Sequence, residues 1–188
     1  YGMLLHRSKD LLGPHGDSLY NALLAGKDQG FVEKIGVSIY DPKELDSLPT
    51  KFKFDLVQAP YNIIDRRLAL SGWLTKLHQA GTEIHVRSVF LQGLLLMKAE
   101  KKPLIFNRWQ QLWDQWHSWL ANQSQTSLQV CLGFVLAQPE IDHVVVGVES
   151  LKQLDELLAV VGKETMLPPE SLMSEDLDLI NPHNWSKL

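Results

Sequence analysis

Short apolar segments alternate with longer segments of helical pattern along this chain. Five of the apolar segments are rich in Val, Ile and Leu and do not alternate cleanly with polar residues: Met3–His6, Lys34–Ser38, Asp55–Ala59, Glu83–Ser88 and His143–Gly147. Such continuous runs are typical of strands that are buried on both faces of a parallel sheet. The pattern therefore predicts a series of strands separated by helices.

Two helices are predicted in the middle of the chain. The first, Asp65–Ala80, begins at a capping-type aspartate and stops at Gly81, a suitable C-terminal cap. Just before it, Asn62 is expected to shape a turn. The second has apolar residues at helical spacing between Trp109 and Leu120, including three tryptophans. This stripe favours core packing over a ligand-binding wall.

Two further helices are predicted near the C-terminus. Thr126–Gln138 is apolar almost all round, which is typical of a buried helix. Ser150–Gln153 has the pattern of a capping box that opens the last helix. That helix is expected to bury Leu154, Leu158 and Val161.

The regular alternation of strand and helix indicates an α/β protein with parallel strands and right-handed crossovers. An open doubly wound sheet and a (β/α)8 TIM barrel both fit this order. The sequence contains neither G-x-G-x-x-G nor G-x-x-x-x-G-K-[ST], which disfavours the open sheet. A full barrel has eight strands and about 250 residues. The 188 residues are therefore expected to form a partial barrel over residues 1–166, the fourth to eighth strands, followed by an irregular surface tail over residues 167–188.

Composition and charge narrow the class of protein. The net charge of −4 and the pI near 6.0 argue against nucleic-acid binding. The longest apolar runs are too short to cross a membrane, and no signal peptide is visible. Cys131 is the only cysteine, so no intrachain disulfide is possible, and a cytoplasmic location is expected. Cys131 is predicted to be a buried apolar residue, and no histidine or cysteine spacing predicts a metal site.

Ordered blocks of residues at the predicted strand ends carry a specific resemblance. The blocks are Leu4–Arg7, Ile35–Ser38, Val57–Asn62, Phe90–Leu95, and Val146–Gly147 followed by Gln153 and Glu156. With these blocks in this order, the chain resembles the C-terminal two-thirds of an aldo/keto reductase. The resemblance runs from Tyr1 to about Val161. It implies a barrel that moves a hydride between NAD(P)H and the carbonyl group of a small molecule.

The first block implies a catalytic role for His6. In the family a histidine at this strand end orients the carbonyl oxygen, a tyrosine donates a proton to it, and a lysine and an aspartate tune the tyrosine. Aligned donors stabilise the negative charge that develops on the oxygen during hydride attack. The resemblance places the aspartate, tyrosine and lysine before this strand, so no residue of the sequence is assigned to them. The alternative for His6 is a strand-end residue satisfied by a backbone partner.

The second and third blocks imply contacts with the nicotinamide carboxamide. Ser38 matches the serine of a Ser-Asn pair in the family, but Ile39 stands where asparagine is usual. One amide contact is therefore expected to be lost, or replaced by Tyr40. Gln58 matches a family glutamine that also binds the carboxamide, since an amide both donates and accepts hydrogen bonds.

The fourth block contains the largest departure from the family. Arg87 stands where the family commonly has an aromatic ring stacked on the nicotinamide. A guanidinium can also stack on a ring, or it can bind an anionic group of the substrate or cofactor. An ion pair with a carboxylate of the barrel is the structural alternative. Ser88, Phe90 and Gln92 match positions that line the path of the pyrophosphate.

The last block implies the adenosine end of the cofactor site. Gly147 would allow close approach of the backbone, and Gln153 and Glu156 match positions that contact the adenosine portion. NADP-preferring members have Lys or Arg here, whereas Glu156 would repel a 2′-phosphate. The resemblance thus implies NAD(P)H with a weak preference for NADH. The capping box alone also explains Gln153.

The resulting hypothesis is an NAD(P)H-dependent oxidoreductase that reduces an aldehyde or ketone to an alcohol. The chain is expected to be a fragment that lacks the family's Asp, Tyr and Lys, and to be inactive alone. The alternative is a non-catalytic, barrel-derived nucleotide-binding or interaction protein, to which the departures at Ile39 and Arg87 give weight. A partial barrel is also expected to be unstable as an isolated monomer, because it exposes sheet edges and part of its core. The sequence predicts neither the particular carbonyl compound nor the oligomeric state.

Overall fold

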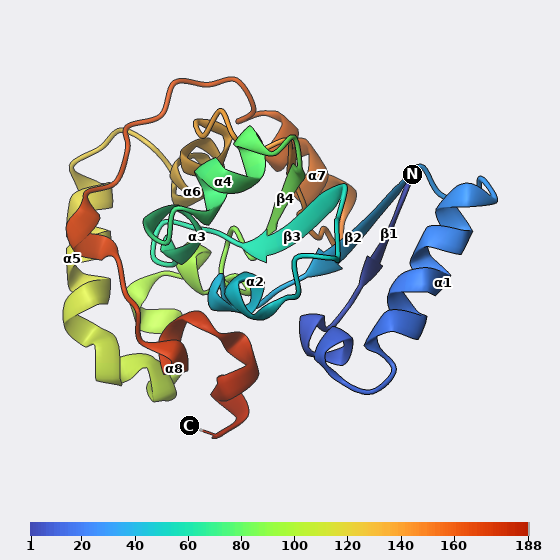
Figure 1. Cartoon of the computed structure of the whole chain (residues 1–188). Helices are drawn as coiled ribbons and strands as arrows, with labels where there is room; N and C mark the ends of the chain where they lie inside the picture. Colours follow the sequence, from blue (N-terminus) through green and yellow to red (C-terminus); the bar gives the residue numbers. More distant parts are fainter. Residues whose placement is uncertain (188) are drawn as a thin grey trace. The chain divides into compact units, whose positions relative to one another are not determined.

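One sheet of five strands forms in the order β1-β2-β3-β4-β5 in the computed structural model, which describes residues 1–187. The strands are β1 (Gly2–Leu5), β2 (Lys34–Ser38), β3 (Leu56–Pro60), β4 (Glu83–Arg87) and β5 (His143–Val144). The pairs β1–β2, β2–β3 and β3–β4 are parallel. The sequential order of parallel strands, visible for β1 to β4 in Figure 1, confirms the predicted α/β class.

The central strands are buried as their apolar sequences predict. Ile35 and Val37 of β2 are 2% and 0% exposed, and Ile84 and Val86 of β4 are both 0% exposed. Between the β2 pair, Gly36 is required by a close approach. A Cβ there would lie 2.4 Å from the carbonyl oxygen of Leu56 in β3. The absence of a side chain at this position therefore lets β2 and β3 pair in register.

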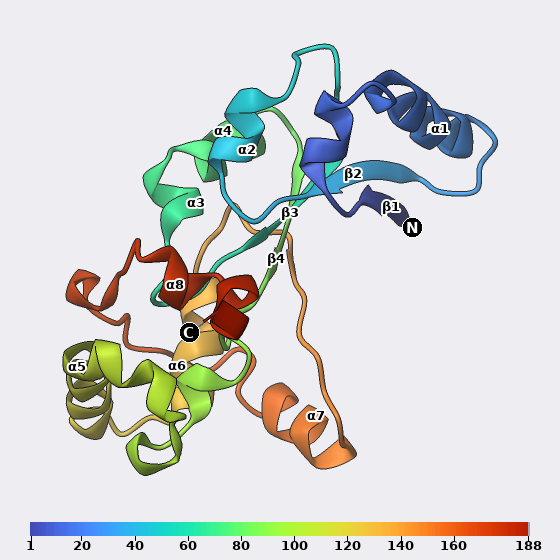
Figure 2. The same ribbon diagram turned by 90° about the horizontal axis from the view of Figure 1, so that it is seen from below.

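Helices follow the strands in alternation. They are α1 (Gly16–Asp28), α2 (Lys43–Ser47), α3 (Arg67–Leu70), α4 (Trp73–Gln79), α5 (Gln110–Ala121), α6 (Ser127–Leu136), α7 (Leu151–Leu158) and α8 (Leu177–Ile180). Helix α1 packs against β2 and α4 against β4, and Figure 2 shows α1 beside β2. Short 3-10 turns connect several of these elements. Among residues 1–187, no helix combines the length and the apolar character that a membrane span needs.

The predicted helix Asp65–Ala80 is wrong as a single element, because it is divided into α3 and α4. Gly72 lies between them with φ of 77°, a left-handed conformation that interrupts the helix. The predicted end is confirmed: Gly81 has φ of 71°, and its N–H donates to the carbonyl oxygen of His78 over 3.0 Å. A hydrophobic pattern does not distinguish one bent helix from two, since both present the same apolar face.

The predicted fifth strand, His143–Gly147, is also too long. Regular strand structure covers only His143 and Val144. Strand β5 is the last in the sheet order, so it lies beside β4 alone in the part of the chain that the structure describes. Val145 beyond it is 45% exposed. The valine run therefore predicted the position of this strand but not its length.

The chain divides into two compact units. The first contains Tyr1–Pro60, Arg67–Arg87 and Glu140–His143. The second contains Tyr61–Arg66, Ser88–Pro139 and the residues from Val144 onward. The first unit thus holds β1 to β4, and the second holds α5 to α8.

The tryptophan stripe and the apolar helix form the core of the second unit, as predicted. Trp113 and Trp116 of α5 are each 1% exposed, and the indole N–H of Trp113 donates to the Phe106 carbonyl oxygen over 3.0 Å. In α6, Cys131 is fully buried. Burial raises the pKa of this thiol far above its usual range, so Cys131 is an inert apolar residue.

The buried face of α7 differs from the prediction. Leu157 is 7% exposed, whereas Leu154, Leu158 and Val161 are 39%, 62% and 54% exposed. The predicted start is confirmed, because the Ser150 hydroxyl accepts a hydrogen bond from the Gln153 N–H over 3.2 Å. Helical periodicity showed which residues share a face, but it did not show which face is covered.

The segment after Leu167 is more ordered than the expected surface tail. It contains α8, and Leu172, Leu179 and Ile180 are 1%, 0% and 2% exposed. Arg66 also holds this segment, since its Nη2 donates to the carbonyl oxygen of Pro168 over 3.1 Å. The residues therefore belong to the core of the second unit.

Candidate functional site

Four predicted site residues lie toward the carboxyl ends of adjacent strands in the first unit. His6 follows β1, Ser38 ends β2, Gln58 lies within β3, and Arg87 ends β4. Ser38 is the register partner of Gln58, so their side chains extend from the same face of the sheet. The carboxyl edge of a parallel sheet is where such folds place their chemistry.

Three of these side chains have polar groups that are available to bind a ligand: His6, Ser38 and Gln58. Within residues 1–187, none of these side chains forms a hydrogen bond with another part of the chain. Ser38 is nevertheless 5% exposed, and Gln58 is half-buried. An imidazole, a hydroxyl and an amide can together both donate and accept hydrogen bonds to a ligand. Among residues 1–187, the His6 side chain does not have the backbone partner that was considered as its alternative.

The Tyr40 ring lies beside both Arg87 and His6, and the sequence did not predict this arrangement. The guanidinium carbon of Arg87 lies 4.5 Å from the centre of the Tyr40 ring, and Arg87 Nη2 donates to the Ile39 carbonyl oxygen over 3.2 Å. The His6 ring approaches Tyr40 edge-on with centroids 6.4 Å apart. Arg87 thus crosses from β4 to the end of β2. The position of Tyr40, two residues after a strand-end serine, was the signal for this role.

Ile39 does not contribute a polar contact to the site. Its side chain is fully buried, and its N–H donates to the Gln58 carbonyl oxygen over 2.9 Å. The side chain therefore belongs to the core.

The loop after β2 is fixed by two charged side chains. The carboxylate of Glu44 accepts hydrogen bonds from the N–H groups of Tyr40 and Asp41, both over 2.9 Å. Arg67 donates to the Asp41 carboxylate over 2.7 Å and to the Tyr40 carbonyl oxygen over 3.1 Å. These bonds hold the backbone that carries the Tyr40 ring, so its position does not depend on a ligand.

The predicted residues Ser88, Phe90 and Gln92 lie in a loop with unusual backbone conformation in the second unit. Ser88, Leu91 and Gln92 have φ of 61°, 46° and 54°, in the left-handed region that residues other than glycine rarely adopt. Such strained positions persist where the surrounding structure holds them, and they concentrate at functional sites.

Asn62 holds this loop, in agreement with its expected role in a turn. Its Nδ2 donates to the Ser88 carbonyl oxygen over 3.0 Å. Its Oδ1 accepts from the N–H groups of Ile64 and Asp65, both over 2.9 Å. One fully buried amide therefore fixes both its own turn and the first residue of the strained loop.

Gly147, Gln153 and Glu156 lie at or beside α7, in the second unit. Gly147 is exposed, and a Cβ there would meet nothing within 4 Å. Gln153 Oε1 accepts from the Glu149 N–H over 2.8 Å, one residue before the N-cap Ser150 to which the side chain of a capping box would return. Glu156 is exposed, and its Oε1 lies 3.9 Å from Lys152 Nζ. The bond from the Glu149 N–H therefore occupies the Gln153 side-chain oxygen, while no contact within the described chain requires glycine at position 147.

Comparisons with solved structures identify proteins of similar fold. An aldo-keto reductase of Bacillus halodurans, AKR11C1, matches in its holo form with a TM-score of 0.71 and 18% identity, over 97% of this chain and 63% of that one. Its apo form matches equally, over 64% of that chain. A thermostable aldo-keto reductase, Tm1743, in complex with the inhibitor epalrestat matches with a TM-score of 0.64 and 21% identity, over 91% of this chain and 59% of that one. No curated protein matches the chain.

These matches confirm the predicted fold class. The parallel sheet with alternating helices corresponds to part of a barrel of the (β/α)8 type, and the chain spans about three-fifths of the length of the matched reductases. In addition, residues 15–173 match the sequence model of the aldo/keto reductase family. This range covers more than half of the chain. The chain therefore belongs to the aldo/keto reductase family.

Proposed function

We propose that this chain is part of an NAD(P)H-dependent oxidoreductase that reduces the carbonyl group of an aldehyde or ketone to an alcohol. Membership of the aldo/keto reductase family supports this reaction class. The observation that carries the proposal is the set of three available polar side chains, His6, Ser38 and Gln58, toward the carboxyl ends of adjacent strands.

His6 is the residue that we propose to contact the substrate. Its imidazole can donate a hydrogen bond to the carbonyl oxygen, on which negative charge develops as the carbon is reduced. The Tyr40 ring beside it limits the positions that the imidazole can adopt. The role of proton donor to the oxygen is assigned to no residue of this chain.

Ser38 and Gln58 fit the carboxamide of a nicotinamide cofactor, which supplies the hydride when it is bound. The carboxamide has one carbonyl acceptor and two N–H donors, and a hydroxyl next to an amide matches that set. Because the two residues are register partners, both side chains leave the same face of the sheet. We assign Arg87, whose guanidinium lies against the Tyr40 ring at the end of β4, to an anionic or aromatic group of the substrate or cofactor.

We also propose, from the resemblance, which residues of the second unit bind the rest of the cofactor. Ser88, Phe90 and Gln92 belong to the strained loop held by Asn62, and we assign them to the pyrophosphate. Gly147, Gln153 and Glu156 are assigned to the adenosine portion. The exposed carboxylate of Glu156 would repel a 2′-phosphate, which supports a weak preference for NADH over NADPH.

Cofactor binding tests the proposal first. Titration of NADH and NADPH into the purified full-length protein, followed by nicotinamide fluorescence, is expected to show binding of both with NADH somewhat tighter. Gln58→Leu should weaken both cofactors by about tenfold, the effect of one lost hydrogen bond of about 1–1.5 kcal/mol. The matched control is Gln79→Leu at the exposed end of α4, which should bind as the wild type does.

Turnover tests the role of His6. His6→Ala in the full-length protein should lower kcat for carbonyl reduction at least about 100-fold while the cofactor affinity stays unchanged. His78→Ala, at an exposed histidine of α4, is the matched control and should keep full activity. Unchanged turnover in His6→Ala would show that the assignment of this histidine is wrong. Cofactor binding without reduction of any carbonyl compound would favour the non-catalytic nucleotide-binding protein.

A further inference from the structure

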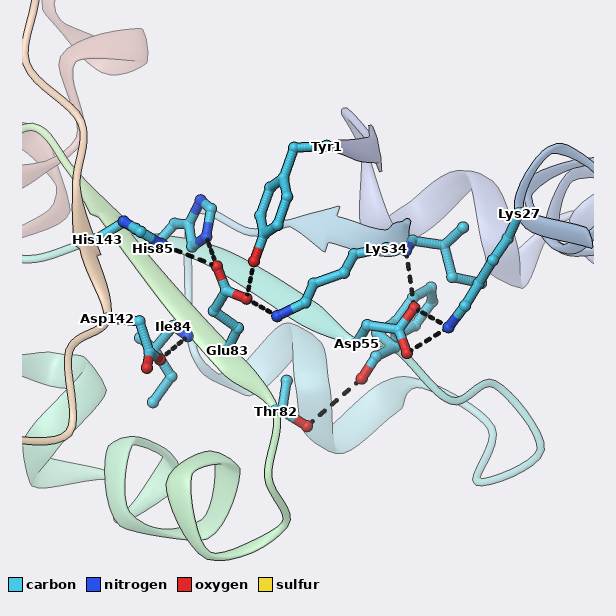
Figure 3. A network of polar contacts seen from close by, with 12 residues as sticks. Tyr1, Lys27, Lys34, Asp55, Thr82, Glu83, Ile84, His85, Asp142 and His143 are labelled. Carbon is cyan, nitrogen blue, oxygen red and sulfur yellow. Dashed lines mark hydrogen bonds and ion pairs between the residues drawn. The ribbon is translucent and has the colours of Figure 1, made fainter. Parts of the chain in front are cut away.

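A second group of polar side chains lies toward the amino ends of the strands in the first unit. Glu83 is the first residue of β4, His85 is two residues further along, and His143 is the first residue of β5. Figure 3 shows both imidazoles beside one oxygen of the Glu83 carboxylate. Glu83 Oε1 lies 2.6 Å from His85 Nε2 and 3.1 Å from His143 Nε2.

The other oxygen of this carboxylate is held separately. Glu83 Oε2 accepts a hydrogen bond from the Tyr1 hydroxyl over 2.6 Å and forms an ion pair with Lys34. Glu83 itself is 7% exposed. The two oxygens therefore have different roles: Oε2 is fixed by Tyr1 and Lys34, and this orientation turns Oε1 toward the two imidazoles.

The two imidazoles have the ligand atoms that a metal ion needs. Their rings lie edge to face with centroids 4.7 Å apart, and each directs its Nε2 to the same oxygen. A neutral imidazole nitrogen is a common metal ligand.

We propose that Glu83, His85 and His143 form a binding site for a divalent transition-metal ion of the zinc type. One ligand atom from each of the three residues lies within 4.8 Å of the others. Ligand atoms of a tetrahedral zinc site are about 3.3 Å apart, since zinc lies about 2.0–2.1 Å from each. Small side-chain movements would therefore admit an ion, with water as the fourth ligand.

The donor set and the local charge indicate which metals fit. Two nitrogens and one carboxylate oxygen suit Zn²⁺, Ni²⁺ or Cu²⁺, whereas Mg²⁺ and Ca²⁺ prefer ligand sets made of oxygen. The positive charge of Lys34 balances the negative charge of the Glu83 carboxylate. This weakens the binding of any cation at the site and favours metals that bind imidazole strongly. His143 is 57% exposed and gives an ion access from solvent.

An ion at this position would join β5 to β4. Strand β5 has only two residues, and its attachment includes the backbone bond from the Asp142 N–H to the Ile84 carbonyl oxygen over 3.0 Å. The Asp142 carboxylate also accepts from the Ile84 N–H over 2.7 Å. A metal bound by His143 and by two residues of β4 would add a further link between the two strands, so the proposed role is structural.

Zinc binding to the purified full-length protein tests the site. The protein is freed of metal with a chelator and then titrated with Zn²⁺ in competition with a chromogenic chelator. We expect one Zn²⁺ per chain, bound at least about tenfold more weakly by His85→Ala, His143→Ala and Glu83→Gln. His78→Ala, at a histidine outside the cluster, is the matched control and should bind as tightly as the wild type. Co²⁺ should give the visible absorption of a four-coordinate ion, and this absorption should be lost in His143→Ala.

Two outcomes would overturn the proposal. One is the absence of Zn²⁺ binding to the wild type at micromolar concentrations. The other is equal affinity and stoichiometry in the wild type and His143→Ala, which would place the ion elsewhere on the surface. Because His143 is largely exposed, its replacement is expected to leave the fold intact. This variant therefore decides the result even if Glu83→Gln fails to fold.

Discussion

Replacing Lys102 with methionine tests how the second unit holds a partly buried ammonium group. Lys102 Nζ donates to the carbonyl oxygens of Leu94 over 2.6 Å and Met97 over 3.3 Å, and it lies 4.4 Å from the centre of the Trp113 ring. Burial lowers the pKa of Lys102 from 10.5 to about 8, and the nearby Cys131 only partly opposes this. The folded protein therefore releases this proton at lower pH than the unfolded chain does.

The direction and size of the effect follow from this difference in pKa. Below about pH 8 the ammonium is charged in both states. Between about pH 8 and 10.5 the unfolded chain holds a proton that the folded protein has lost, so the free energy of unfolding rises with pH. The pKa difference corresponds to at most about 3 kcal/mol. Because Lys102 keeps some contact with solvent, we expect screening to reduce this to about 1–2 kcal/mol.

Urea unfolding measures the effect directly. The free energy of unfolding is determined for the wild type and Lys102→Met between about pH 7.5 and 10.5, with tryptophan fluorescence as the signal. The wild type should gain about 1–2 kcal/mol relative to Lys102→Met across this interval, because the other titrating groups are common to both proteins. Lys98→Met, at an exposed lysine nearby, is the matched control and should change in parallel with the wild type. A difference between the wild type and Lys102→Met that does not change with pH would refute the reasoning.

Three other substitutions give direct measurements by the same urea method. Burial acts to raise the pKa of Asp55, but hydrogen bonds from Lys27 and from the Ile35 N–H of β2 outweigh this effect and hold the pKa below 3.8. Asp55→Asn should therefore have a lower free energy of unfolding than the wild type near neutral pH. This difference should vanish as the pH falls below 3.8, through the lowered pKa of Asp55. Gly36→Ala should lose at least about 1–3 kcal/mol, because the new Cβ would lie 2.4 Å from the Leu56 carbonyl oxygen. Trp113→Ala should lose about 3–5 kcal/mol, as expected for a buried aromatic side chain.

The sequence predicted the strands well because burial on both faces produces uninterrupted apolar runs. The run Lys34–Ser38 coincides with β2, and the runs around Leu56–Pro60 and Glu83–Arg87 match β3 and β4 to within a residue or two. Prediction was poorest where tertiary context decides the outcome. Gly72 divides one apolar stripe into two helices through its backbone conformation, which leaves no trace in the hydrophobic pattern.

Whether another segment packs over an apolar helix face is also decided by the tertiary structure. The stripe on α7 was recognised, yet Leu157 is buried and Leu158 is 62% exposed. Conversely, Leu179 and Ile180 are buried in a segment whose prolines and acidic residues are typical of a surface tail. Both differences concern what packs against a segment, and this information is not contained in the segment itself.

The proposed site residues were assigned through the resemblance to the family, and their roles stay predictions. The structure places His6 just after β1, Ser38 at the end of β2 and Gln58 in the middle of β3. The contact of Arg87 with Tyr40 was not predicted, because it joins β4 to the loop after β2 across an intervening strand. Contacts of this kind depend on loop and side-chain conformation, which the predicted order of the strands does not provide.

The polar residues of β4 connect the two proposed sites. Glu83, His85 and Arg87 alternate along this strand and so extend from the same face. Glu83 and Arg87 lie about 13 Å apart along the strand, at opposite ends of the sheet, where barrels separate stability from chemistry. His85, however, is the register partner of Gln58 and lies between the two sites. Changes at Glu83 and His143 therefore separate metal binding from cofactor binding, whereas His85→Ala is expected to affect both.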